Sequence, residues 1–104
     1  MSHEIIIEMA MKRREAFDNL KEYLKTIKGV VEKLDDKAEL YLFGSVPEKR
    51  YAYSSDVDVL VLTTAEPAKV HLELWKAGIR EPFEIHVHPP EKAGLFGSKL
   101  VKVV

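Results

Sequence analysis

Two short stretches decide the fold of this chain, Leu42-Phe43-Gly44-Ser45 and Ser55-Asp56-Val57-Asp58-Val59-Leu60-Val61. The first completes an apolar, aromatic segment, so a strand is predicted over residues 38–43, and it runs into a glycine-serine turn. The second opens a β-branched segment, which predicts another strand over residues 57–63. Residues 46–55 contain a proline and several polar groups, and this composition predicts a turn with a short helical piece.

A long helix is predicted before these strands. Apolar residues recur at three- and four-residue steps from Ser2 to about Leu34, which is the periodicity of an amphipathic helix. Ser2 is its expected N-cap. Gly29 is the position at which this helix could bend or split.

A second helix and a third strand are predicted after the two central strands. Glu66-Pro67 begins the helix and Gly78 ends it, with apolar residues between them. Residues 83–88 then form a strand that stops at two prolines. The tail stays open, because residues 93–97 resemble a loop, whereas residues 100–104 could form an edge strand or a docking segment.

The order of these elements predicts one α/β (α+β) domain over residues 1–104, with a small mixed sheet covered by helices. A chain of 104 residues suits one compact domain. Because 46% of the residues are hydrophobic, disorder is not expected. The net charge of -1 argues against a protein that binds nucleic acid through its overall charge alone.

The composition also limits the kind of site and its location. The chain has no cysteine, which excludes a disulfide framework and thiolate metal sites. Its apolar runs fall short of the roughly 20 residues that span a bilayer, and its start does not resemble a signal peptide. We therefore expect a cytoplasmic protein without a membrane segment.

Two aspartates at the start of the second strand are the first candidate site. Asp56 and Asp58 are two residues apart, so they are expected on the same face of the strand, with converging carboxylates. Adjacent carboxylates repel each other, and a divalent cation with oxygen ligands, usually Mg²⁺, relieves that repulsion. A polar strand start with two solvated aspartates stays an alternative.

The third strand adds an acid to this site. Alternation sends Phe83, Ile85 and Val87 to one face and Glu84, with two histidines, to the other. Glu84 could therefore meet the two aspartates and complete the three carboxylates that a two-metal phosphoryl-transfer site needs, as a metal ligand or as the proton acceptor. Glu81 is a second candidate, in the turn before the strand.

The glycine-serine turn is a candidate phosphate site. Gly44 lets the backbone approach a phosphate closely, and the Ser45 hydroxyl and nearby N–H groups can donate hydrogen bonds to phosphate oxygens. A simple turn explains the same dipeptide, so its position between two strands carries the inference.

Taken together, Leu42-Phe43-Gly44-Ser45 and the Asp56-Val57-Asp58 segment resemble the signature of the polymerase β-like nucleotidyltransferases, in particular their minimal members. The resemblance covers residues 38–88 and implies a nucleotidyltransferase-like fold. It implies Mg²⁺-dependent transfer of a nucleoside monophosphate, AMP from ATP, to an acceptor hydroxyl with release of pyrophosphate. Asp56 and Asp58 would bind metal, and Gly44 and Ser45 would bind the triphosphate.

The chain departs from that pattern in two places. Many minimal members have a small residue, an arginine and a glycine soon after the Gly-Ser pair, but this chain has Val46-Pro47-Glu48-Lys49-Arg50. Arg50 or Lys49 could still reach the triphosphate, and a solvated charged turn is the alternative. The third carboxylate is Glu84 where an aspartate is commoner, which lengthens its reach by one methylene.

A histidine metal site and a P-loop are two alternatives to this acidic site. His86 and His88 on one strand face, with His71, could bind a transition metal. A P-loop is excluded because no Gly-x-x-x-x-Gly-Lys-Ser/Thr run occurs.

A binding module is the alternative class of function. The resemblance implies that such proteins pair with a helical partner, and that in toxin-antitoxin systems the smaller chain neutralises a helical toxin. The expected partners are a nucleoside triphosphate, such a helical toxin and a second copy of the chain in a homo-oligomer. Because all three acids are present, retained catalysis is the favoured prediction.

Overall fold

The protein is described here by a computed structural model, which covers residues 3–44, 56–96 and 100–103. Its elements are three helices, a 3₁₀ helix and four strands: α1 (His3–Asp18), α2 (Leu20–Leu34), β1 (Glu39–Phe43), β2 (Val57–Leu62), α3 (Pro67–Lys76), β3 (Phe83–His88), η1 (Pro90–Phe96) and β4 (Val101–Lys102).

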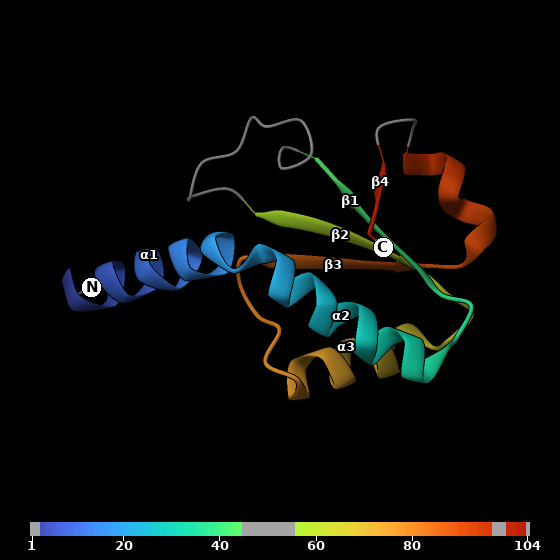
Figure 1. Cartoon of the computed structure of the whole chain (residues 1–104), viewed down its shortest axis with the longest axis horizontal. Coiled ribbons are helices and arrows are strands. Elements are labelled where there is room, and N and C mark those ends of the chain that lie inside the picture. Colours follow the sequence, from blue (N-terminus) through green and yellow to red (C-terminus); the bar gives the residue numbers. More distant parts are fainter. Residues whose placement is uncertain (1–2, 45–55, 97–99, 104) are drawn as a thin grey trace.

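The four strands form one mixed sheet in the order β3-β2-β1-β4. β2 and β3 are parallel, and they are joined through α3 as a crossover. β1 is antiparallel to β2 and to the short edge strand β4. Helices α2 and α3 pack on one face of the sheet, and α1 extends beyond it (Figure 1). The predicted α/β class with a small mixed sheet is confirmed.

The main core lies between the sheet and helices α2 and α3. Alternate residues of β2, namely Val57, Val59 and Val61, are completely buried and face the helices. Apolar side chains of the two helices meet them, including Leu24, Ile27, Val31, Val70 and Leu74. Because successive side chains of a strand point to opposite faces, the residues between these valines face the other side of the sheet, where the acidic residues lie.

The first helical region differs from the prediction at its break. The chain forms two helices that are separated at Asn19, whereas Gly29 lies within α2. Ile27 and Val31 are buried on either side of Gly29, so packing against the sheet holds that segment helical despite the low helix propensity of glycine. The Asn19 side-chain amide donates to the Glu15 carbonyl oxygen at 3.0 Å. The predicted cap Ser2 lies outside the described residues.

The later elements agree closely with the sequence. β3 has the predicted bounds, α3 begins at Pro67, and Gly78 follows its end with φ of 90°. In the tail, Val101–Lys102 forms the edge strand β4, one of the two alternatives for this segment. Residues 93–96 belong to the helix η1, so the expectation of a loop there was wrong. The turn predicted over residues 46–55 lies outside the described part. Among the described helices, none is long and apolar enough to span a bilayer.

A polar contact links the end of α2 to the end of β2. The buried Thr63 hydroxyl donates to the Asp35 carboxylate at 2.6 Å. That bond, followed by the Lys37 backbone N–H, lowers the pKa of Asp35 below its usual value of 3.8. The contact therefore stabilises the fold above that value, and its contribution is lost as the pH falls through the lowered pKa of the folded protein.

Thr63→Val is expected to lower the thermal midpoint at pH 7 by roughly 4–8 °C, since valine keeps the shape of the side chain but lacks the hydroxyl that donates to Asp35 and accepts from the Ala65 backbone N–H. The difference from wild type should shrink as the pH falls below the usual pKa of an aspartate and Asp35 becomes protonated. Thermal unfolding followed by circular dichroism at several pH values checks this. Thr64→Val is the matched control, because only the backbone N–H of Thr64 donates to Asp35. A pH-independent difference would contradict the explanation.

Candidate active site

Hydrogen bonding between β2 and β3 places two acids side by side. Asp58 and Glu84 are Cα partners in the parallel ladder. Their neighbours Val57, Val59, Phe83 and Ile85 pack on the helix-covered side. Both carboxylates therefore project from the opposite face of the sheet, as alternation requires.

His86 joins these two acids. Asp58, Glu84 and His86 each offer one ligand atom, and the three atoms lie within 4.8 Å of one another. The His86 Nε2 atom is 3.4 Å from Asp58 Oδ1, and the two side chains are 30% and 25% exposed. The group is thus reachable from solvent but partly shielded, which is the setting in which carboxylates and imidazoles bind cations.

Gly44 closes one side of this group. It follows β1, has φ of 79°, and a Cβ built on it would overlap Asp58 Oδ2. A side chain at this position would be strained by the backbone conformation and would also displace the aspartate carboxylate. The structure therefore gives the glycine of the Gly-Ser pair a specific role, namely to leave room for Asp58.

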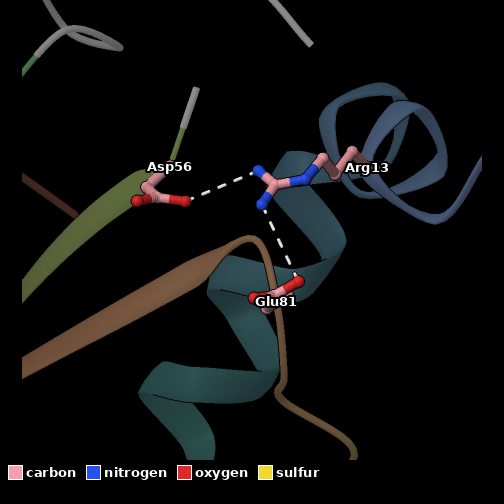
Figure 2. A network of polar contacts seen from close by, with 3 residues as sticks. All are labelled: Arg13, Asp56 and Glu81. Atoms are coloured by element: carbon pink, nitrogen blue, oxygen red, sulfur yellow. Dashed lines mark hydrogen bonds and ion pairs between the residues drawn. The ribbon is translucent and has the colours of Figure 1, made fainter. Parts of the chain in front are cut away.

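Asp56 points elsewhere. It directly precedes β2, and its side chain is 52% exposed. Its Oδ1 atom is 3.4 Å from Arg13 Nη1 of α1, and Nη2 of the same guanidinium lies 3.7 Å from Glu81 Oε2 (Figure 2). Asp56 is thus not among the described residues whose ligand atoms lie within 4.8 Å of one another, and its Oδ1 atom is paired with the α1 arginine instead.

The other predicted residues are distributed as follows. Ser45, Lys49 and Arg50 lie outside the described residues. The His88 ring packs 5.0 Å from that of Phe96, and His71 lies on α3 at a separate cavity. Within the described part of the chain, the three histidines thus do not assemble into the alternative metal site.

Two residues of this region were not assigned a role in the acidic site from the sequence. His86 shares a strand face with Glu84, and the alternation that located Glu84 also carried this signal. No sequence pattern indicated Arg13, because its contact with Asp56 depends on how α1 is oriented relative to α2.

A cavity of about 550 Å³ lies on the helix-covered side between α1, α3 and β3. Its walls include Leu74, Trp75 and Phe83, with Arg13 and Arg80 among the cations. The Arg80 guanidinium stacks 3.6 Å from the centre of the Trp75 ring. This cavity is distinct from the group of Asp58, Glu84 and His86, which faces the other side of the sheet, although Arg13 and Glu81 line the cavity and also lie beside Asp56.

The fold and the site together define a small α/β protein with a carboxylate-lined group suited to a divalent cation. The chain belongs to the nucleotidyltransferase domain family, whose model matches residues 24–102. Among solved structures, it is similar to a "putative nucleotidyltransferase" from Sulfolobus solfataricus, with a TM-score of 0.53 and 20% identity over 90% of this chain and 85% of that one. That likeness supports the fold. No curated protein matches the sequence significantly.

Proposed function

We propose that this chain is a Mg²⁺-dependent nucleotidyltransferase that transfers AMP from ATP to an acceptor hydroxyl. Membership of the nucleotidyltransferase domain family supports nucleotide transfer in general. The observation that carries the finer proposal is the pairing of Asp58 with Glu84 on adjacent strands, next to a glycine that leaves room for the aspartate.

The donor set fits a divalent cation. Two carboxylates whose oxygens lie within 4.8 Å of each other repel when both are ionised, and a cation held between them removes that cost. Asp58 and Glu84 would hold the ion, and Asp56 is assigned as a further ligand. When bound, the cation neutralises charge on the phosphates and makes the attacking hydroxyl more acidic.

The chain's residues then have the following roles in the proposed reaction. The acceptor oxygen forms a bond to the α-phosphorus of ATP, and the bond to the bridging oxygen breaks, so that pyrophosphate leaves. The acceptor proton passes to Glu84, which is exposed and can return it to solvent. Gly44, Ser45 and Arg50 are assigned to the triphosphate.

Arg13 bears on how Asp56 would act. A guanidinium 3.4 Å from Asp56 balances part of the charge that a cation would otherwise neutralise. Arg13 and the cation are therefore expected to compete for Asp56. Loading with metal and nucleotide would move the carboxylate from the arginine towards Asp58.

A second candidate function is binding of a helical partner protein, as in a toxin-antitoxin pair. It is favoured by α1, which extends beyond the sheet (Figure 1) and carries exposed Ile7 and Met11. Apolar side chains on a projecting helix suit a protein contact. That partner could also carry the acceptor hydroxyl, so the two functions are compatible.

Calorimetric titration of ATP with Mg²⁺ tests the first proposal. Wild type is expected to bind ATP in a metal-dependent manner, and a folded Asp56→Asn, Asp58→Asn double variant is expected to lose that binding. Glu32→Gln, Asp36→Asn is a control with the same change in charge, at two exposed acids at the far end of α2. Equal or absent binding in wild type and double variant would reject a working metal site and leave the partner-binding function.

A further inference from the structure

The acidic site contains an imidazole in addition to its carboxylates, and this changes the class of metal ion that it suits. We infer that His86 is a metal ligand together with Asp58 and Glu84, and that the site therefore selects a transition-metal dication such as Mn²⁺ over Mg²⁺. The inference rests on the proposed function, since it concerns the cation of the same site.

The first argument is distance. Two ligand atoms about 2.1 Å from one ion are separated by about 3.0 Å in octahedral and about 3.4 Å in tetrahedral geometry. The His86 Nε2 and Asp58 Oδ1 atoms are 3.4 Å apart, and Glu84 supplies an oxygen within 4.8 Å of both. A small movement of the exposed Glu84 side chain towards the other two ligand atoms would complete a set of three ligands.

The second argument is the way in which the His86 ring is held. It packs edge-on to Phe43, with 5.1 Å between ring centres, and Phe43 in turn packs 5.5 Å from Phe96 of η1. These contacts keep Nε2 turned towards Asp58. A ligand that is already oriented loses little conformational freedom when a metal binds.

The third argument is ligand chemistry. Mg²⁺ strongly prefers oxygen donors and keeps much of its water, whereas imidazole nitrogen suits later and softer divalent ions. One imidazole with two carboxylates therefore adds affinity for Mn²⁺ that Mg²⁺ does not share. If His86 only formed a hydrogen bond with Asp58, the carboxylates alone would set the preference, and substitution of His86 would leave it unchanged.

The test measures binding of MnCl₂ and of MgCl₂ to the metal-free protein by calorimetry, with pulsed electron paramagnetic resonance of the Mn²⁺ complex as a second readout. Wild type is expected to bind Mn²⁺ at least about ten-fold more tightly than Mg²⁺. Its Mn²⁺ spectrum should show modulation from a coordinated imidazole nitrogen. His86→Gln is expected to reduce the Mn²⁺ preference about ten-fold and to abolish that modulation.

His88→Gln is the matched control, because His88 lies on the same face of β3 but contacts Phe96; it should leave both readouts unchanged. Circular dichroism confirms that each variant is folded. His86→Asp, which restores three carboxylates, should shift the preference towards Mg²⁺.

Two results would overturn the inference, and they separate it from the proposed function. If both metals bind through Asp58, with an unchanged preference in His86→Gln and no nitrogen modulation, His86 is not a ligand, while the proposed function stands. If wild type binds neither metal alone nor with ATP, both are rejected.

Discussion

Asp58→Asn is expected to reduce nucleotide transfer about a thousand-fold, which corresponds to several kcal/mol of lost transition-state stabilisation. Asp58 is the centre of the site, since Glu84 is its partner in the ladder, His86 Nε2 lies 3.4 Å away, and Gly44 leaves room for its carboxylate. Asparagine keeps the size of the side chain but removes the charge that a cation needs. The rate is measured as pyrophosphate released from ATP.

Asp36→Asn is the control for this substitution, because Asp36 is an exposed acid in the turn before β1, remote in sequence from both site strands. It should transfer nucleotide at the wild-type rate. Wild-type release of pyrophosphate by a folded Asp58→Asn protein would remove Asp58 from the mechanism. The measurement counts transfers to whatever acceptor the reaction mixture contains, because each transfer releases one pyrophosphate.

Gly44→Ala has the second large expected effect. Its φ of 79° costs an L-residue about 1–2 kcal/mol, and the added Cβ would overlap Asp58 Oδ2. We therefore expect a lower free energy of unfolding together with at least ten-fold weaker metal binding, because the Asp58 carboxylate must move. Urea unfolding and calorimetry measure the two effects separately.

The chain offers a matched control for each part of this prediction. Gly78 also has a positive φ, of 90°, but nothing lies within 4 Å of a Cβ there, so Gly78→Ala should lose stability without weakening metal binding. Gly29 lies in an exposed helix position with open space around it. Gly29→Ala should raise the free energy of unfolding by about 0.5–1 kcal/mol. Equal metal affinity in Gly44→Ala and wild type would reject the role of Gly44.

The features that could be predicted from the sequence are those set by local pattern. The predicted bounds of β3 agree with the structure, because its residues alternate in polarity and two prolines follow it. The same alternation placed Glu84 on the face of Asp58. The predicted helix between β2 and β3 is compatible with their parallel pairing, since a crossover returns the chain in the same direction.

The features that were missed depend on contacts between distant segments. The break at Asn19 rather than Gly29 reflects packing of α2 on the sheet, which overrides local propensity. The orientation of Asp56 depends on Arg13, which is 43 residues away in sequence. Side chains alternate between the two faces only within a strand. Asp56 lies just before β2 begins, so its direction does not follow from that alternation.

Parallel pairing of Asp58 with Glu84 also bears on how the sheet responds to an ion. The two acids belong to strands separated along the chain by α3, and β3 is an edge of the described sheet. A cation held by both would act as a cross-link between these strands, and it would be lost when they separate. Its binding free energy would add to the free energy needed to detach β3 from β2. The concentration of free metal would therefore determine how firmly this edge of the sheet is held, as well as the occupancy of the site.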